Sequence, residues 1–406
     1  MQRLTIRFLP IAFALAALAC ASPLLAPTPV PDSPATESLS PTPEAAISIT
    51  DTPAPEAAPT ETNALIIPAT GLIAYTRFGI EGAQIFVFDW ETAKSTQLTS
   101  GGFSASYPLW SPDGKLLVYS QIDTAIERID LMVLDIFGGQ EPHLLTPNGI
   151  EGFPRLSWSP DNSYIVYYGP GEGGIESDIY RIDVNTSDML NLTSGISAWD
   201  SNPDWSSDGA HIAFVSDREP VTDDIWVMNP DGSEPRRLTG ATEAEADWED
   251  HQPVWSPDST QIAFYRWSFL EGAGIGGGID LEGDPGLWLV GLDGQPARQL
   301  FGFTDLPQFS EAPVWSPDGQ WIALNIGNES ETDVWVVSSL TGEGVNISGL
   351  PGQEMAITWS PDSQSLLFTN IDPNGNLFLY GIDRDGTGLH LLIEEPGLGS
   401  ADWSSP

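Results

Sequence analysis

The sequence predicts an all-β protein, a seven-bladed β-propeller of four-stranded antiparallel blades. Three observations lead to this prediction. A phrase close to Trp-Ser-Pro-Asp-Gly recurs along the chain, the same order of short strands follows each full copy, and the two ends of the chain carry complementary fragments of one unit. Repetition at a period of about 40 to 50 residues is typical of propellers.

The tryptophans of the phrase set the period, with separations of 48, 47, 50, 60, 44 and 44 residues. They are Trp110, Trp158, Trp205, Trp255, Trp315, Trp359 and Trp403. We expect each indole to pack between adjacent blades, because a radial stack of sheets buries large aromatic side chains at every repeat. In the turn that follows, Pro presets φ, Asp bonds its own backbone and Gly takes a positive φ. The phrase is therefore interpreted as structural.

Four short strands are expected in each period. In the first full unit they are residues 107–111, 115–121, 129–136 and 142–146. Their alternating apolar residues and their β-branched and aromatic content favour strands over helices. No stretch after residue 70 shows sustained helical periodicity.

The ends of the repeat region predict how the ring closes. It opens with "GLIAYTRF", "QIFVFDW" and "STQLTS", which read as the second, third and fourth strands of a unit without its first strand. The chain ends with "SADWSSP", a first strand alone. We expect the C-terminal strand to join the N-terminal three, which gives six complete blades and one shared blade and leaves only short protected edges.

Two stretches carry a resemblance to a known family. "PVWSPDGQWIAL" is followed by "TDVWVVSS", and "PDWSSDGAHIAFVS" by "DDIWVMNPDGSEPRRLT". These resemble the WD40-like (PD40) repeats of TolB-type β-propellers, over about residues 72 to 406. The resemblance implies a propeller of the bacterial lipoprotein type in the cell envelope; similar propellers also cap prolyl-oligopeptidase-type peptidases. TolB differs in having a small α/β domain before six blades, and the peptidases carry an α/β-hydrolase domain.

The N-terminus predicts export. Residues 1–20 combine two arginines with an apolar run of signal-peptide length, and they end at Cys20, the one cysteine of the chain. The position of Cys20 resembles the lipobox of bacterial lipoproteins, so lipidation and a membrane anchor are expected there. Residues 21–70 are rich in Pro, Ala, Thr, Ser and Glu, which predicts a disordered tether. Residues 71–406 form the expected propeller.

The charge of the chain restricts its partners. The formal net charge is -43, from 57 acidic and 14 basic residues. Nucleic acid and anionic lipid surfaces would be repelled, whereas basic proteins or cationic polymers would not. We expect a monomer whose partner is an envelope protein, a peptide or a glycan.

Variable loops on one face of the propeller are the expected binding site, because binding concentrates on loops that a rigid scaffold holds. The longest is residues 268–286, and an acidic loop runs from residue 240 to the fourth phrase, that of Trp255. The candidate binding residues are Glu243, Glu245, Asp247, Trp248, Glu249, Asp250, His251, Trp199, Asp200 and Trp267. A solvated acidic loop, a ligand site and a Ca²⁺ site all remain open at this stage, although no defined calcium loop is present.

The function expected from these features is a non-enzymatic binding or scaffold module without a cofactor. The sequence contains no G-x-S-x-G elbow and no H-E-x-x-H motif. The alternative is a propeller hydrolase or lyase that acts on a polymer, with acidic residues at the channel mouth as acid and base.

Overall fold

The computed structural model describes residues 71–404 apart from short gaps, of which the longest are 241–247, 269–284 and 304–310. The chain divides into two units, residues 1–64 and 65–406, and every described residue belongs to the second. The predicted signal segment, Cys20 and the predicted tether therefore lie outside the described residues. In the part that is described, no helix occurs, and no helix could cross a membrane.

The described strands form six sheets. The first holds β1 (Leu72–Gly79), β2 (Gly82–Asp89), β3 (Lys94–Gln97) and β28 (Leu398–Trp403). The second holds β4 (Ser104–Trp110), β5 (Leu116–Asp123), β6 (Arg128–Asp135) and β7 (His143–Leu144). The third holds β8 (Ser157–Trp158), β9 (Tyr164–Pro170), β10 (Ser177–Asp183) and β11 (Met189–Asn191).

The remaining sheets repeat this plan. The fourth holds β12 (Asp200–Trp205), β13 (Ile212–Ser216), β14 (Asp224–Met228) and β15 (Arg236–Arg237), and the fifth holds β16 (Trp248–Trp255), β17 (Gln261–Ser268), β18 (Gly286–Gly291) and β19 (Arg298–Gly302). The sixth holds β20 (Val314–Trp315), β21 (Trp321–Gly327), β22 (Thr332–Ser338), β23 (Gly344–Asn346), β24 (Gln353–Trp359), β25 (Ser365–Ile371), β26 (Leu377–Asp383) and β27 (His390–Leu391). Its two antiparallel groups of four strands are joined by one parallel pair, Thr332 with Gln353.

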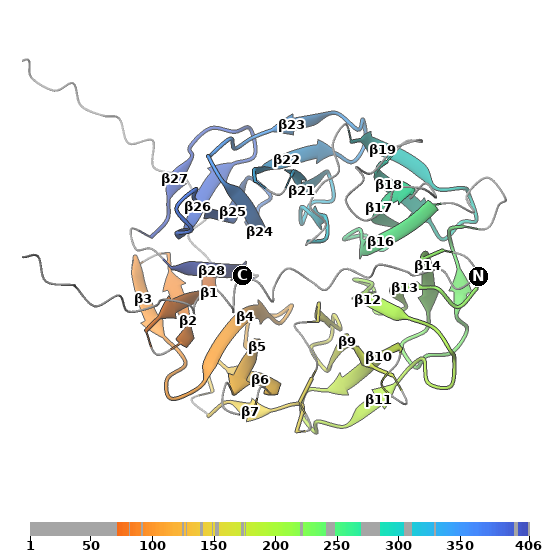
Figure 1. The fold of residues 1–406 in the computed structure, drawn as a ribbon, viewed down its shortest axis with the longest axis horizontal. Helices are drawn as coiled ribbons and strands as arrows, with labels where there is room; N and C mark the ends of the chain where they lie inside the picture. The colour runs from red at the N-terminus through yellow and green to blue at the C-terminus, as the bar shows by residue number, and fades with distance from the viewer. Residues whose placement is uncertain are drawn as a thin grey trace, which may run out of the picture. The chain divides into compact units, whose positions relative to one another are not determined.

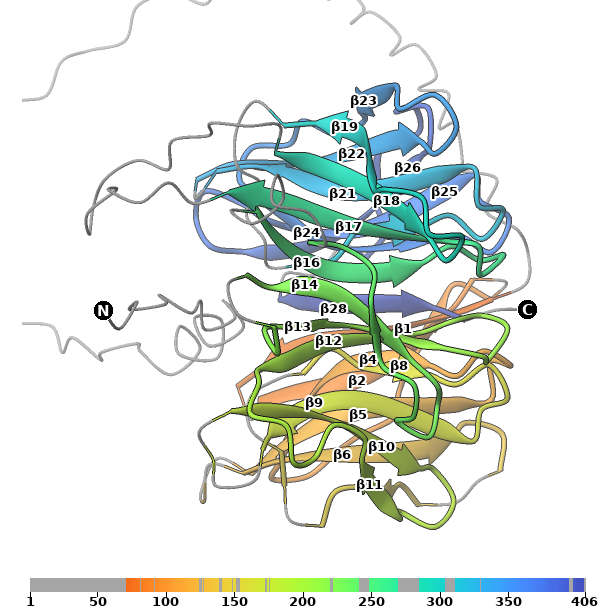
Figure 2. The same ribbon diagram turned by 90° about the vertical axis from the view of Figure 1, so that its right-hand side faces the viewer.

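The last strand of the chain completes the first sheet. β28 runs antiparallel to β1, with Ile73 opposite Trp403 and Ala74 opposite Asp402. The strand order is β28-β1-β2-β3, so the C-terminal strand occupies the position that the first strand occupies in the other sheets. Figure 1 shows the sheets following one another around a common centre, and Figure 2 shows that the strand ends gather on two opposite faces.

The core consists of seven hydrophobic clusters among the described residues, and each combines side chains from two successive groups of four strands. Each phrase tryptophan lies in a different cluster and is 5 to 9% exposed. Trp403, for example, packs with Ile73, Leu367 and Leu379, which come from the first and sixth sheets. The predicted packing role of the tryptophans is confirmed.

The phrase turns lie on one of the two faces, which we call the phrase-turn face (turns 111–114, 159–162, 206–209, 256–259, 316–319 and 360–363). Each turn closes by a backbone hydrogen bond, such as Gly114 N to Ser111 O at 2.9 Å. Its last residue has a positive φ whether it is Gly114 (66°) or Ser363 (62°). This confirms the turn that the sequence predicts.

Where serine or asparagine replaces the glycine, the side chain links two turns. Asn162 Oδ1 accepts from Asp113 N at 3.1 Å, and Ser259 Oγ accepts from Asp208 N at 2.9 Å. Ser363 Oγ accepts from Asp318 N at 3.0 Å. A residue other than glycine is strained at positive φ, and the bond to the neighbouring turn offsets that strain.

Candidate functional site

The face opposite the phrase turns, which we call the crossover face, carries the sequence-predicted candidates that the structure describes on β16 and β17. Adjacent strands alternate in direction, so β16 begins and β17 ends on this face. Glu249 pairs with Trp267 and His251 pairs with Tyr265 between these strands. Trp248, Glu249 and His251 are half-buried, whereas Trp267 is buried.

His251 lies at the centre of a group that we call the mouth cluster (Asp223, Glu249, His251 and Trp267). Its imidazole stacks on the Trp267 indole, with ring centroids 4.2 Å apart and planes 13° apart. The two ring nitrogens face two carboxylates: Nε2 is 3.4 Å from Glu249 Oε2, and Nδ1 is 3.8 Å from Asp223 Oδ2. Asp223 immediately precedes β14 in the neighbouring sheet, and the sequence analysis did not single it out.

Asp250 has a different environment from its two neighbours on β16. It is 1% exposed and forms two short contacts with Arg266, Nε to Oδ1 at 2.6 Å and Nη2 to Oδ2 at 2.7 Å. The Arg266 guanidinium also lies 4.6 Å from the Trp288 ring centre. Asp250 is therefore committed to a buried ion pair, and the structure corrects the expectation that it faces a ligand.

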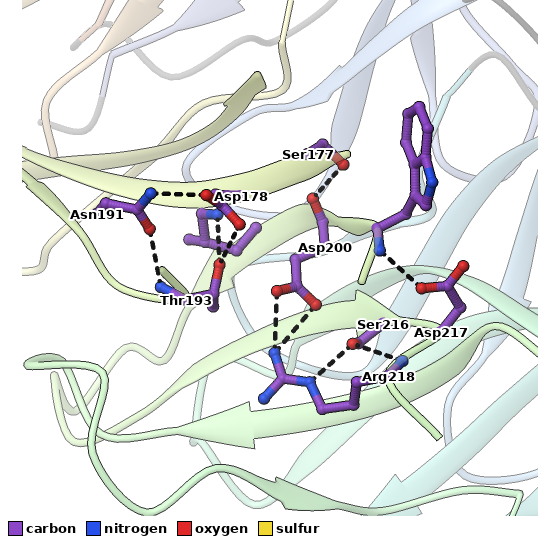
Figure 3. Close-up of polar contacts among 10 residues, drawn as sticks. Ser177, Asp178, Asn191, Thr193, Asp200, Ser216, Asp217 and Arg218 are labelled. Atoms are coloured by element: carbon purple, nitrogen blue, oxygen red, sulfur yellow. Dashed lines mark hydrogen bonds and ion pairs between the residues drawn. The ribbon is translucent and has the colours of Figure 1, made fainter. Parts of the chain in front are cut away.

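Asp200 also forms a buried ion pair with an arginine. Both of its carboxylate oxygens accept from Arg218 Nη2 at 3.0 Å, and its backbone carbonyl accepts from Ser177 Oγ (Figure 3). Burial raises the pKa of Asp200, and the charge of Arg218 opposes that rise. The expectation that Asp200 faces a ligand is corrected for the same reason. Trp199 lies beside it at 37% exposed, and its backbone N–H donates to Asp217 at 2.6 Å.

The acidic loop that the sequence analysis emphasised is only partly described. Glu243, Glu245 and Asp247 lie outside the described residues, as do most residues of the 268–286 insertion. A surface depression of about 490 Å³, lined in part by Thr260 and Arg298, lies near the 256–259 turn and is separate from the mouth cluster.

A second group of polar residues lies where the first strands of the sheets converge; we call it the central cluster (Tyr107, Arg155, Asp204 and Glu311). Arg155, which precedes β8, donates to Asp204 in the fourth sheet at 3.2 Å and to the Pro253 carbonyl in the fifth at 2.9 Å. A side chain can reach past a neighbouring sheet only near the centre around which the sheets are arranged (Figure 1). Asp204 also accepts from Trp255 N at 2.8 Å.

Besides Asp204, whose pKa burial also raises, Glu311 is a carboxyl group of this cluster with altered electrostatics. Burial raises the pKa of its carboxyl to about 7, although hydrogen bonds from the Ala356 and Ile357 backbone N–H groups lower it. The Ala356 bond measures 2.5 Å. Burial, and then the negative charge of Glu311, raise the pKa of Tyr107 to about 12, and both causes also raise the pKa of Tyr265.

A carboxyl group with a pKa near 7 can accept and donate a proton at neutral pH, which is what a general acid-base catalyst requires. The charge of Glu311 acts on tyrosines from the second and fifth sheets, and the pKa of Tyr265 is also lowered by Arg155 from the third. The central cluster therefore combines the carboxyl groups of Asp204 and Glu311 with the Arg155 guanidinium and the Tyr107 phenol, and the charges of Glu311 and Arg155 also act on Tyr265. Sequence reasoning missed Tyr107, Arg155, Asp204 and Glu311 because their shared feature, a position one to four residues before a phrase tryptophan, carries no catalytic motif.

Comparison with known proteins finds sequence relatives of this chain, but it does not assign the chain to a protein family. No family model matches the chain. An uncharacterized protein of Agrobacterium fabrum is 28% identical over 257 residues, which is 53% of this chain and 82% of that protein. The uncharacterized peptidase YuxL of Bacillus subtilis and dipeptidyl-peptidase 5 of Porphyromonas gingivalis are each 26% identical, over 43% and 50% of this chain. The chain matches 29% of the length of each peptidase.

Solved structures share the fold. Oligogalacturonate lyase from Vibrio parahaemolyticus is 14% identical, with a TM-score of 0.58 over 77% of this chain and 91% of the lyase. A puromycin-hydrolyzing peptidase of Mycobacterium tuberculosis is 18% identical, with a TM-score of 0.56 over 79% of this chain and 53% of the peptidase. TolB from Acinetobacter baumannii also aligns, over 82% of each chain at 17% identity and a TM-score of 0.49. The all-β propeller fold predicted from the repeats is confirmed.

The relatives overturn the expected function. A non-enzymatic binding module was expected from the sequence, but the relatives YuxL and dipeptidyl-peptidase 5 are peptidases. The expectation of a non-enzyme is therefore wrong, and the alternative, an enzyme of the hydrolase or lyase kind, agrees better with the comparisons. The absence of catalytic motifs from the sequence was a poor guide to function, because a propeller can bring together reactive side chains from several sheets.

Proposed function

We propose that this chain is the propeller of a hydrolase that acts on basic peptides, with Glu311 as the general acid and base. The observation that carries the proposal is the position of Glu311 in the central cluster, where its carboxylate accepts from Ala356 N at 2.5 Å and its charge acts on Tyr107 and Tyr265. Its raised pKa, about 7, is consistent with proton transfer at neutral pH. The peptidase relatives support hydrolysis as the reaction and a peptide as the substrate.

The central cluster provides the groups that hydrolysis needs. Ionised Glu311 takes a proton from a water molecule as that water attacks the peptide carbonyl carbon. The protonated carboxyl then donates the proton to the leaving amine as the C–N bond breaks, which yields a carboxylic acid and an amine; the acid then passes its proton to the amine, so that the products leave as a carboxylate and an ammonium group. The positive charge of Arg155 and the Tyr107 hydroxyl stabilise the negative charge that develops on the carbonyl oxygen.

The charge of the chain supports a basic substrate. A net charge of -43 raises the local concentration of cationic peptides and their rate of encounter. The mouth cluster adds two carboxylates on the crossover face. Trp199, Trp248 and Trp267, together with Glu243, Glu245 and Asp247, are proposed to contact the substrate as it enters.

We also propose the number of blades in the propeller and the location of the protein in the cell. Seven blades, with a ring closed by β28 in the first sheet, are supported by the β28-β1 pairing and by the seven clusters, each of which lies between two successive groups of four strands. Export is supported by the N-terminal 20 residues, with lipidation at Cys20 as the anchor to a membrane.

The test is peptide hydrolysis by the purified chain and two glutamine variants. Glu311→Gln removes the proton-transferring group at nearly constant volume, and at least a 100-fold loss of kcat is expected, consistent with the contribution of general acid-base catalysis. Glu354→Gln is the matched control, because burial also raises the pKa of Glu354 to about 7, but its carboxylate bonds Ser348 and the Val334 backbone. Equal activity of the two variants, or an inactive parent chain, would refute the proposal.

A further inference from the structure

We propose that the mouth cluster is a binding site for one divalent transition-metal ion, held by His251 together with Asp223 and Glu249. One possible ligand atom of each of these residues lies within 4.8 Å of the others. The inference does not depend on the proposed hydrolase activity, because it concerns residues outside the central cluster.

The distances suit a single ion after small side-chain adjustments. Two ligands of one zinc-like ion stand about 3 to 4 Å apart, since each bond measures about 2.0 to 2.2 Å. His251 Nε2 already lies 3.4 Å from Glu249 Oε2, and Nδ1 lies 3.8 Å from Asp223 Oδ2. One ligand atom of each residue lies within 4.8 Å of the others, so one ring nitrogen of His251 and one oxygen of each carboxylate can turn toward a single ion.

The ligands are held on rigid elements. The imidazole cannot swing freely, because it stacks on Trp267, which is 6% exposed. Between the two ligands on β16, Asp250 donates its backbone N–H to the Asp223 carbonyl at 2.8 Å and holds Arg266 in a buried ion pair. Hydrogen bonds thus fix the backbone positions of all three ligands across two sheets. Because the ligands are already ordered, metal binding loses little conformational entropy.

The ligand set indicates the class of ion. An imidazole nitrogen with two carboxylates suits Zn²⁺ or Mn²⁺, whereas Ca²⁺ takes oxygen ligands. All three ligand residues are half-buried, so three protein ligands leave coordination positions open to water or to a substrate oxygen. Ca²⁺, which the sequence left open as one alternative for the acidic loop, gives way in this proposal to a transition-metal ion.

The test is titration of the full chain, purified without a histidine tag, with Co²⁺ as a coloured probe. We expect one equivalent to bind with visible absorption bands that Zn²⁺ displaces. His251→Ala should abolish the bands, and Asp223→Asn and Glu249→Gln should each weaken binding at least tenfold. His211→Ala is the matched control, because His211 also packs on a tryptophan, Trp255, but has no place in the cluster. We expect it to bind as the parent does.

Three results would overturn the site: no Co²⁺ bands at millimolar ion, bands that survive both carboxylate variants, or binding of Ca²⁺ with no binding of Co²⁺. The thermal unfolding of each variant is measured beside the titration. If His251→Ala does not fold, the two isosteric carboxylate variants decide the question, since they leave the stacked imidazole in place.

Discussion

Asp402, on the last strand of the chain, accepts a 2.8 Å hydrogen bond from the backbone N–H of Trp110, on the first strand of the second sheet. Thr358 in the sixth sheet donates to the other oxygen of Asp402 at 3.3 Å. Asp402, the residue before the last phrase tryptophan, thus links its own strand to both neighbouring sheets. Asp204 makes the same bond to Trp255 N.

Replacement of Asp402 should weaken the junction between the two ends of the chain. Asp402→Ala leaves the Trp110 N–H without its acceptor, and such a loss costs about 1 to 3 kcal/mol. The measurement is the free energy of unfolding in urea. Glu141→Ala, at an exposed position, is the control, and an equal effect of the two variants would contradict the linking role.

Removal of the buried arginine on β17 should destabilise far more than removal of a surface cation. Arg266→Ala leaves Asp250 charged and buried, which costs about 3 to 5 kcal/mol. Lys115→Ala breaks an exposed pair with Asp113, in which the lysine side chain is 66% exposed, and should change the free energy of unfolding little. The free energy of unfolding of both variants is measured in urea. Similar losses for the two variants would show that the buried Asp250–Arg266 ion pair contributes no more to stability than a surface pair.

Replacement of Ser363 with alanine should lower the stability of the protein more than replacement with glycine. Both substitutions lose the bond from Asp318 N, worth about 1 kcal/mol. Only alanine keeps a side chain at the positive φ of 62°. The midpoint of thermal unfolding is expected in the order parent, then Ser363→Gly, then Ser363→Ala. A midpoint for Ser363→Ala that equals or exceeds that of Ser363→Gly would argue against backbone strain at this turn.

Stability should be greatest near pH 4 to 5 and fall toward pH 8. Burial raises the pKa of Glu311, Glu354 and Asp224 to about 7 and that of Asp402 to about 6. The native state therefore keeps these protons after the unfolded chain has released them, so stability is lost as pH rises from about 4 through the native pKa values.

Exposed turn carboxyls act in the opposite direction at lower pH. Hydrogen bonds from Asn376 lower the pKa of Asp372 to about 2, so its contribution is lost only below pH 4. Thermal unfolding at a series of pH values checks the profile, and Glu354→Gln should flatten its slope between pH 5 and 8. A midpoint that rises from pH 5 to pH 8 would contradict the assigned pKa directions.

Much of the fold could be predicted because it depends on local patterns. The period of Trp110 and its equivalents, the alternation within strands, and the turn residues all repeat within one unit. The complementary ends predicted the pairing of β28 with β1, which the register shows. The Asn162 and Ser259 links between turns could not be foreseen, because they depend on which turns become neighbours in space.

The site was harder to predict, since it depends on contacts between units. Glu249 and His251 were found by their clustering in sequence, but Asp223 belongs to the preceding unit. Asp250 looked equivalent to Glu249, and only the position of Arg266 on the paired strand shows that it is buried in an ion pair. Glu311 stands alone in the sequence, and its raised pKa arises from burial in the folded chain.

The most direct test of the central claim is the pH dependence of kcat/KM for hydrolysis of a basic peptide by the purified chain. The account predicts a rate that rises with pH through an apparent pKa near 7, because free Glu311 must be ionised to act as the base. The Glu354→Gln variant should keep that profile, and the Glu311→Gln variant should lose it. A rate without a transition near pH 7, or the same transition in the Glu311→Gln variant, would contradict the assignment.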